Sequence, residues 1–309
     1  MKASNLLLSV FVLSAFIGRT QSNFHLTQYM VHQPFINPSA MASYDEMNLA
    51  LFYRNQWTGF QGAPVTQGVS FSTPIGKTNN FLGLNVMHDV IGVNSSTLIS
   101  LPYSYSIRLT KQYKLSFGIA PSISTIQSNL SEIHTINDND PIYQQNLPTV
   151  IVPNSSFGMY FFSKRFYAGY AIPKMLHNNI VVQEKIDVKN TFNWKQLHHY
   201  LSIGIRFPVN RNLDFNVSTL GKYVHGSSLQ LDINAQALFM KKVGIGASYR
   251  TSNELAAILT IQALKYFKFS YAYEYNFARI GDYSNGSHEI MLIIEIRKRL
   301  TPKVSVPRF

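Results

Sequence analysis

The stretch Thr97–Leu109, TLISLPYSYSIRL, decides the fold class of this 309-residue chain. Its large apolar side chains occupy every second position, namely Ile99, Leu101, Tyr103, Tyr105, Ile107 and Leu109. The positions between them carry small, polar or charged residues, namely Ser100, Pro102, Ser104, Ser106 and Arg108. Alternation with a period of two predicts a β-strand whose two faces meet different surroundings.

The same alternation recurs along the chain, and no comparable helical stripe accompanies it. Counting every such run predicts about 14 strands of roughly 9 to 13 residues, the length that a tilted strand needs to cross a bilayer. An even number is usual for bacterial barrels formed by one chain. The expected spans are 47–57, 65–75, 81–88, 97–109, 112–125, 154–163, 165–173, 197–208, 211–224, 228–240, 242–251, 254–262, 267–276 and 286–297.

The lengths of the connections are the stronger indication. Those after even-numbered strands are short, whereas those after odd-numbered strands are longer on average and include 126–153, 174–196 and 277–285. Short turns on one side and long loops on the other are typical of outer-membrane barrels. We therefore expect an all-β transmembrane outer-membrane β-barrel of about 14 antiparallel strands. Both termini would lie on the short-turn side, which faces the periplasm.

The first residues, MKASNLLLSVFVLSAFIGRTQS, have the anatomy of a secretory signal peptide. Lys2 supplies the positive charge, and an apolar run of about a dozen residues is too short for a spanning helix. We expect cleavage between Thr20 and Ser22, so that 1–22 is the signal peptide. Residues 23–309 would then form a single barrel domain with long surface loops near 126–153 and 174–196. A basic periplasmic tail around Arg297–Arg299 would complete it.

The composition agrees with a barrel and excludes several other classes. Charged residues are 14% of the chain, whereas about a quarter is usual in soluble domains. There are no cysteines, which removes disulfides, thiolate metal sites and cysteine nucleophiles. The net charge of +12 comes from scattered residues, which argues against nucleic acid as a partner and leaves outer-membrane lipid as the expected surroundings.

Charged residues on the polar face are expected to point into the lumen. They could pair with one another and fill the barrel, or they could line a selective channel; we favour pairing. A barrel of 14 strands is also wide enough for an inward-folded long loop to close it. The predicted lumen charges are Arg54, Arg108, Arg206, Asp214, Asp232, Lys242, Arg250, Glu254, Lys268, Glu274, Glu289 and Glu295.

Catalytic, metal and cofactor sites are not expected. Ser287, His288 and Glu289 are neighbours, but alternation places His288 on the opposite face from the other two. His198 and His199 are separated in the same way and could not share a metal ion. The run 137–140, NDND, offers oxygen ligands but lacks the glycine and the distal glutamate of a calcium loop, so a solvated turn is the simpler interpretation.

The segment that follows the signal peptide, FHLTQYMVHQPFINPSAMASYDEMNLALFYRNQWTGFQGAPVTQGVSFSTPI (24–75), is distinctive. Its QYM…NP start and the YRNQW-x-GF-x-GAP-x-TQ block resemble the PorP/SprF family of the type IX secretion system in Bacteroidota. The resemblance continues to the end of the mature chain through GLNVMHDVIGV, KLSFGIAPSI, RFYAGYAIPKML, LQLDINAQALF, VGIGASYR and GSHEIML. The departures from the family lie in the long loops.

The resemblance implies a non-enzymatic outer-membrane component of the secretion and gliding apparatus. It implies partners on both sides: periplasmic ring lipoproteins and a peptidoglycan-associated lipoprotein, and the C-terminal domain of a secreted adhesin or other cargo. Arg54, Asn55, Gln56 and Trp57 would be the family motif at the outer end of the first strand. They could contact a partner, or Arg54 and Gln56 could form hydrogen bonds in the lumen while Trp57 anchors the interface. A passive porin or small-solute channel is the alternative function.

Overall fold

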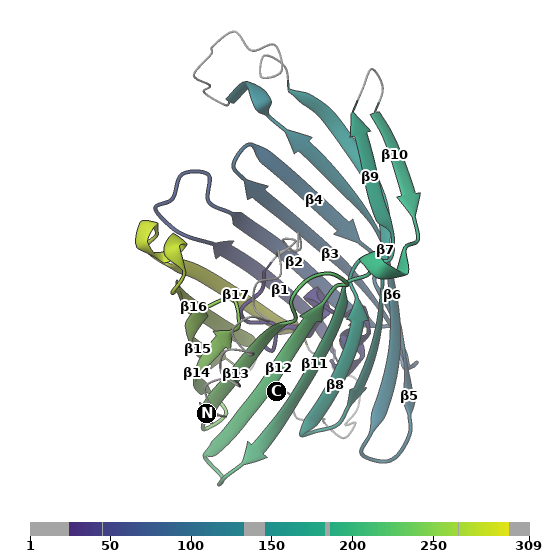
Figure 1. Ribbon diagram of the computed structural model, residues 1–309. Coiled ribbons are helices and arrows are strands. Elements are labelled where there is room, and N and C mark those ends of the chain that lie inside the picture. Colours follow the sequence, from purple (N-terminus) through teal and green to yellow (C-terminus); the bar gives the residue numbers. More distant parts are fainter. Residues whose placement is uncertain (1–24, 45, 133–145, 183–185, 265, 297–309) are drawn as a thin grey trace, which may run out of the picture.

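The computed structural model describes residues 25–44, 46–132, 146–182, 186–264 and 266–296, and in these the chain forms one closed antiparallel β-barrel of 14 crossings (Figure 1). Neighbouring strands are paired around the circle, and β1 pairs with both β2 and β17, which closes it. The barrel strands are β1 (Met47–Asn55), β2 (Val65–Pro74), β3 (Asn80–Ile91), β4 (Asn94–Ser100), β5 (Tyr103–Arg108), β6 (Lys114–Ser128), β7 (Leu147–Phe162), β8 (Phe166–Ile172), β11 (His199–Pro208), β12 (Leu213–Tyr223), β13 (Gln230–Phe239), β14 (Val243–Arg250), β15 (Glu254–Leu264), β16 (Phe267–Asn276) and β17 (Ser287–Ile296).

Strands β4 and β5 are the two halves of one crossing, which the alternation had predicted as the single strand 97–109. Both halves pair with β3 on one side and β6 on the other. The break falls at Leu101 and Pro102, because proline has no backbone N–H for the ladder. The backbone N–H of Leu101 instead reaches the carbonyl of Pro121, and the carbonyl of Pro102 accepts from Gly83. With the two halves counted as one, the prediction of 14 strands is confirmed.

The two large excursions are more ordered at their bases than the sequence indicated. Pairing of β6 with β7 continues past Ile126 and Val150, so the strands extend into the segment 126–153 that we expected to be loop. The segment 174–196 contains a separate two-stranded hairpin, β9 (His177–Val182) with β10 (Ile186–Thr191). The hairpin lies beside the upper part of β7 in Figure 1.

The connections fall into two groups at opposite ends of the barrel. We call one end, with the connections β2–β3, β5–β6, β7–β8, β11–β12, β13–β14 and β15–β16, the short-turn end. The other end, which carries β9, β10 and the remaining connections, is the long-loop end. β1 begins and β17 ends at the short-turn end, as the antiparallel order requires.

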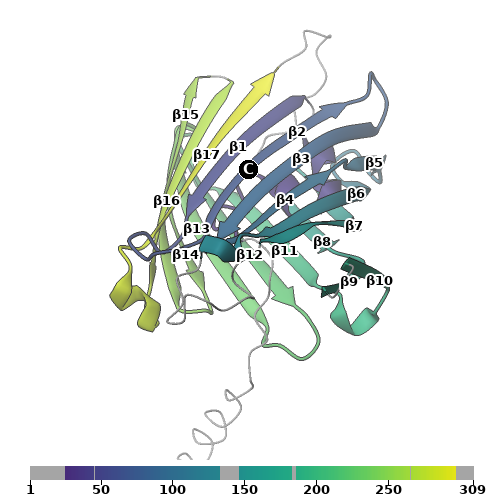
Figure 2. The same ribbon diagram turned by 90° about the horizontal axis from the view of Figure 1, so that it is seen from above.

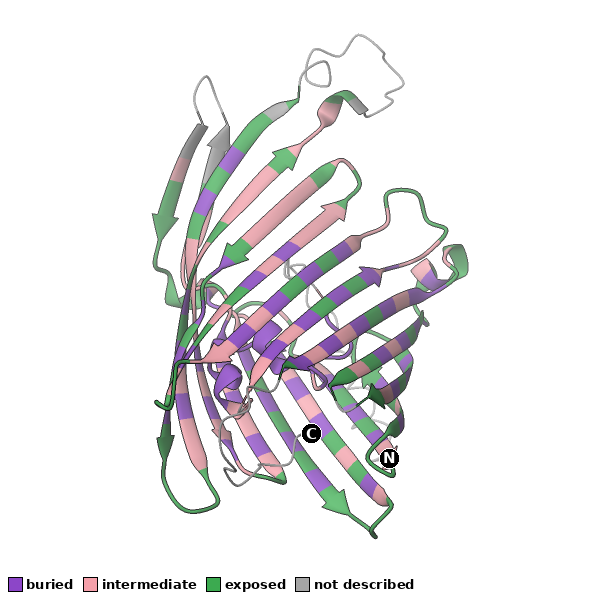
Figure 3. Cartoon of the chain, turned by 180° about the vertical axis from the view of Figure 1, so that it is seen from behind, coloured by how far each residue is buried: buried purple, intermediate pink, exposed green. Residues whose placement is uncertain are grey.

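Exposure alternates along the strands in the sense opposite to that of a soluble protein (Figure 3). On β11, Leu201 is 52% exposed whereas its neighbour Ser202 is 3% exposed. On β5, Tyr105 is 43% exposed and Ser104 is fully buried. Apolar side chains on the outer surface and polar ones inside are the arrangement that a hydrocarbon environment stabilises.

Residues 25–44, which precede β1, lie inside the barrel and are almost entirely buried. We call this segment the plug. It contains two short 3₁₀ helices, η1 (Gln33–Phe35) and η2 (Pro38–Ser43), which are visible within the ring of strands in Figure 2. The other short helices, η3 (Leu130–Glu132), η5 (Trp194–Gln196) and η6 (Arg279–Tyr283), lie in the connections. No helix in the described part of the chain has the length and hydropathy to span a membrane.

Candidate functional site: the plugged lumen

The start of the plug is bound by two carboxylates of the barrel wall. Glu289 accepts hydrogen bonds from the backbone N–H groups of Thr27 and Gln28, both at 2.8 Å. Glu274 accepts a hydrogen bond from the hydroxyl of Thr27 at 2.6 Å. Arg54 lies between the two carboxylates, 2.6 Å from Glu274 and 3.0 Å from Glu289, and it also donates to the Thr27 hydroxyl at 2.7 Å. Charge-assisted hydrogen bonds of this kind are among the strongest in proteins.

The same network continues around the wall. Arg250 pairs with Asp232 at 3.0 Å and with Glu254, and Lys222 pairs with Asp232 at 3.1 Å. Arg250 also lies 3.4 Å from Glu274, which connects the two halves of the network. Side chains of opposite sign therefore neutralise one another inside the barrel, as the pairing interpretation predicted.

The predicted lumen charges differ in how far their side chains are buried. Most are buried, and Arg206 forms a further ion pair with Asp214. Arg108 and Lys242 are exposed at the short-turn end, and Lys268 is half-buried there. Lys222 was not among the predicted charges, although its position on β12 follows the same alternation. The buried set is Arg54, Arg206, Asp214, Asp232, Arg250, Glu254, Glu274, Glu289 and Glu295.

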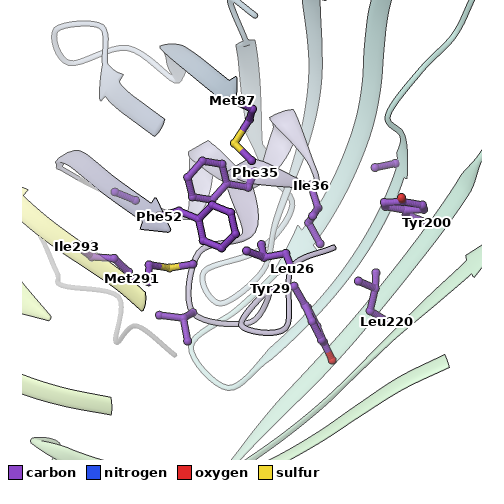
Figure 4. Close-up of a cluster of buried hydrophobic side chains, with 13 residues drawn as sticks. Leu26, Tyr29, Phe35, Ile36, Phe52, Met87, Tyr200, Leu220, Met291 and Ile293 are labelled. Carbon is purple, nitrogen blue, oxygen red and sulfur yellow. The ribbon is translucent and has the colours of Figure 1, made fainter. Parts of the chain in front are cut away.

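The middle of the plug packs through apolar side chains against strands on opposite sides of the barrel (Figure 4). Phe35 lies against Phe52 of β1, with ring centroids 5.8 Å apart. Tyr29 crosses toward β12, where its hydroxyl lies 3.2 Å from Ser218. The wall contributes the following members of the cluster: Ala50, Phe52, Met87, Ala171, Tyr200, Leu220, Met291 and Ile293. Because these contacts run to strands on opposite sides of the circle, the plug spans the lumen at this level.

The end of the plug rests directly on the backbone of β6 and β7. The side-chain amide of Asn37 donates to the carbonyl of Met159 at 3.1 Å, and the hydroxyl of Ser116 donates to the carbonyl of Ser39 at 2.8 Å. Gly118 and Gly158 are cross-strand partners at this contact. A Cβ atom on Gly118 would lie 2.6 Å from the backbone nitrogen of Ser39, so only glycine permits this approach.

The substitution Gly118→Ala is expected to destabilise the plugged barrel by about 1–3 kcal/mol, because the added methyl group meets plug backbone that cannot rotate away. Urea unfolding of the detergent-solubilised barrel would measure this. Gly221→Ala is the matched control, since its Cβ would have no neighbour closer than 3.4 Å. Equal stability of the two variants would contradict the close contact.

His32 is fully buried in the plug, outside the membrane-spanning strands, and its Nε2 lies 2.9 Å from the hydroxyl of Ser70. Burial, with a smaller contribution from the charge of Lys268, lowers the pKa of His32 to about 3. The folded protein therefore keeps this ring neutral at pH values where an unfolded chain, with an ordinary histidine pKa near 6.5, would protonate it.

Plug packing is therefore expected to weaken as the pH falls from about 6.5 toward 3, and to be independent of His32 above that window. A loss of up to about 1.4 kcal/mol per pH unit follows from the binding of one proton by the unfolded state alone. Unfolding at pH 7 and pH 4.5 would be compared for the wild type and His32→Gln. The variant should lose part of the pH dependence; an unchanged dependence would show that other groups cause it.

The four residues of the predicted family motif lie where β1 ends and its connection to β2 begins, at the long-loop end. Arg54 is 1% exposed and Gln56 7% exposed, and both are buried within the barrel, whereas Asn55 is half-buried and pairs with His288. Trp57 lies beyond the strand, not within it, with a positive φ of 52°. Its backbone N–H donates to the hydroxyl of Ser287 at 3.1 Å. Arg54 therefore contacts the plug through Thr27, and the hydrogen bond from Trp57 to Ser287 joins the start of the β1–β2 connection to β17.

Ser287, His288 and Glu289 are separated as the alternation predicted. Ser287 and Glu289 are buried toward the lumen, whereas His288 is bonded to the hydroxyl of Tyr271 at 2.7 Å. Among the described residues, no group of three or more acidic or histidine side chains is placed to hold a metal ion. The run 137–140 lies outside the described residues, as does the proposed signal peptide.

A closed barrel with an apolar outer surface and a polar lumen defines the class: this is a bacterial outer-membrane β-barrel protein. Among known structures it resembles the CymD monoaromatic hydrocarbon channel, with a TM-score of 0.51 and 10% identity over 91% of this chain and 96% of that one. It also matches a Pseudomonas aeruginosa FadL homologue, with a TM-score of 0.43 and 11% identity over 84% of this chain and 92% of that one. The match to Acinetobacter baumannii Omp33 has a TM-score of 0.45 and 6% identity over 82% of this chain and 100% of that one. These likenesses concern the fold alone.

The family is defined by sequence. The chain belongs to the type IX secretion system membrane protein PorP/SprF family, whose profile matches residues 19–294. The match confirms the resemblance seen in the motifs, and it includes the plug. Membership makes the protein an outer-membrane component that works with other parts of this secretion system. Among curated proteins, no sequence matches this chain.

Proposed function

We propose that this protein is a non-enzymatic docking barrel of the type IX secretion and gliding system. It would bind ring lipoproteins and a peptidoglycan-associated lipoprotein at the periplasmic side, and it would assist the export or surface attachment of secreted proteins at the cell surface. Removal of a signal peptide at 1–22 would precede insertion. The short-turn end would face the periplasm, which is the usual orientation of outer-membrane barrels.

The observation that supports this proposal most is the plug. A passive solute channel needs a continuous aqueous path, whereas residues 25–44 occupy the lumen and contact strands on opposite sides of it. With the lumen filled, the turns and loops at the two ends are the surfaces left for function. Among the described residues of the long-loop end, the β9–β10 hairpin and the extended ends of β6 and β7 are the larger structures.

Site-specific photo-cross-linking in the cell tests the proposal. A cross-linking residue would replace Lys111, exposed in a short turn, or Trp194, which is 66% exposed at the long-loop end. We expect a ring or peptidoglycan-associated lipoprotein at the first position and secreted cargo at the second. Leu201, which is exposed on the outer surface of β11, is the control and should capture neither. Identical products at both ends, or none, would contradict the proposal.

A further inference from the structure

Two histidines on the outer surface of the barrel have the same surroundings. His199 is the first residue of β11 and His288 is the second residue of β17, so both lie at the long-loop end. A tyrosine hydroxyl of a neighbouring strand is bonded to Nδ1 of each ring, at 2.8 Å from Tyr170 and at 2.7 Å from Tyr271. The strands β12 to β16 separate the two histidines, so the arrangement occurs on two sides of the circle.

A second tyrosine lies directly opposite each histidine, namely Tyr223 on β12 and Tyr273 on β16. Its ring contacts the imidazole, with ring centroids 6.4 Å apart in the first pair and 5.3 Å apart in the second. The hydroxyl of Tyr273 also donates to the carbonyl of Asn285 at 3.2 Å, which holds that ring in place. Each imidazole therefore contacts two tyrosines, and the barrel wall sets its orientation.

The hydrogen bond at Nδ1 leaves Nε2 as the free nitrogen of each ring. A phenol hydroxyl is a stronger donor than acceptor, so it donates to Nδ1 and places the proton of a neutral imidazole on Nε2. A protonated ring carries a proton there as well. Within the described part of the chain, neither Nε2 atom forms a hydrogen bond, and neither is enclosed by protein. Both rings therefore offer an unused N–H donor at the outer surface.

A further donor lies beside His288. Asn55, a residue of the family motif, is directly opposite it in the pair of β1 with β17 and faces outward, because its neighbours Arg54 and Gln56 are buried in the lumen. Directly opposed side chains have Cβ atoms about 4.5–5.5 Å apart. The Asn55 side-chain amide has no hydrogen-bond partner among the described residues. The outer face of this strand pair thus combines two donors, while Arg54 and Glu289 bind the plug on its inner face.

The surroundings of both histidines change from apolar to polar along the barrel axis. Toward the short-turn end, the next outward residue on each strand is apolar and exposed, namely Ile290 at 39% and Leu201 at 52%. Toward the other side lie the short helices η6 and η5, which carry the exposed cations Arg279 and Lys195. Asp282 also lies in η6, so the positive charge is in excess beside η5 only. A molecule with acyl chains below and an anionic oxygen above matches this order.

We propose that His199 and His288 bind the phosphate groups of phosphorylated lipids in the leaflet at the long-loop end, with Asn55 as a second donor beside His288. A hydrogen bond from an N–H group to an anionic phosphate oxygen is stronger than one between neutral groups. The acyl chains of the same lipid would cover the exposed apolar side chains of the strands, which a free phosphate ion could not do. The proposal goes beyond the function above, and takes from it only the orientation that makes this leaflet the one at the cell surface.

Native mass spectrometry of the full-length barrel in a nonionic detergent, with lipid added at increasing concentration, tests this. Phosphatidic acid supplies a phosphate monoester, and diacylglycerol with the same acyl chains lacks it. We expect phosphatidic acid to bind at least about tenfold more tightly than diacylglycerol. The triple variant Asn55→Leu/His199→Phe/His288→Phe should lose most of this preference, because it removes the donors and keeps apolar side chains at the same positions.

His225→Phe, which replaces an exposed histidine in the connection between β12 and β13, is the matched control and should keep the wild-type preference. Every variant must keep the heat-modifiable migration of a folded barrel. Equal binding of the two lipids by the wild type, or an unchanged preference in the triple variant, would overturn the proposal. Displacement of phosphatidic acid by an equal concentration of inorganic phosphate would overturn it too, because the site would then take a free anion. Cross-linking in the cell reports separately on the proposed function, because it detects captured protein and not bound lipid.

Discussion

Removal of residues 25–44 is expected to convert a non-conducting barrel into an open pore. The plug is held in the lumen by hydrogen bonds from its first residues to Glu289, by the apolar cluster at its middle, and by the contact of η2 with β6 and β7. Its deletion would expose a lumen lined largely by serine, asparagine and paired charges, which water can fill. In planar bilayers the full-length protein should show no stable conductance, whereas the deletion variant should show long-lived openings.

Two controls separate loss of the plug from loss of the fold. Deletion of the β9–β10 hairpin, which forms a sheet of its own, should leave the barrel without stable conductance. Because the chain has no cysteine, Ser39→Cys places a single thiol in the buried plug, where a maleimide should react slowly unless the plug leaves. Stable conductance by the full-length protein while that thiol stays protected would revive the porin alternative.

Loss of Arg54 should destabilise the barrel more than Gly118→Ala does. Arg54→Gln leaves Glu274 and Glu289 buried, adjacent and without their shared cation. Removal of one partner from a buried ion pair typically costs about 3–5 kcal/mol, whereas an exposed pair contributes little. Urea unfolding of the detergent-solubilised barrel would measure the loss. Arg279→Gln, at an exposed position of η6, should change the stability by less than about 0.5 kcal/mol.

A second substitution tests whether the carboxylates left without their cation cause the loss of stability. Glu289→Gln added to Arg54→Gln should recover part of the stability, because it removes a buried carboxylate that has lost its cation, whereas Glu274 still has Arg250 at 3.4 Å. Arg54→Lys should fall between wild type and Arg54→Gln, since an ammonium group cannot reach both carboxylates with the planar fork of a guanidinium. If Arg54→Gln unfolded like the wild type but lost its cross-links to secretion components, the family motif would act through direct partner contact.

Much of the site could be predicted from local pattern. Nine of the twelve lumen charges that alternation predicted are buried, and the mixture of signs indicated pairing of the kind that Arg54 makes with Glu274 and Glu289. The choice of partners could not be predicted in this way. It depends on the strand register, in which Arg54 lies opposite Glu289, and on the curvature that brings Glu274 within reach from the next strand.

The plug was not predicted; the only inner segment considered from the sequence was an inward-folded long loop. Its sequence has neither a period of two nor a helical period, and it mixes buried apolar residues with buried polar ones. Only a lumen that offers carboxylates, hydroxyls and apolar side chains together can bury such a segment. The glycines on β6 and β7, Gly118 and Gly158, were a signal that could have been used, because small residues on a lumen face leave room for an inner chain.

The sequence by itself determined that this chain is a barrel of 14 crossings with short turns at one end, since alternation and connection length are local properties that the bilayer imposes on each strand. Only the tertiary structure decided that the lumen is filled, and by which segment. The contact between Thr27 and Glu289 joins residues 262 positions apart, and it exists only once the barrel has closed.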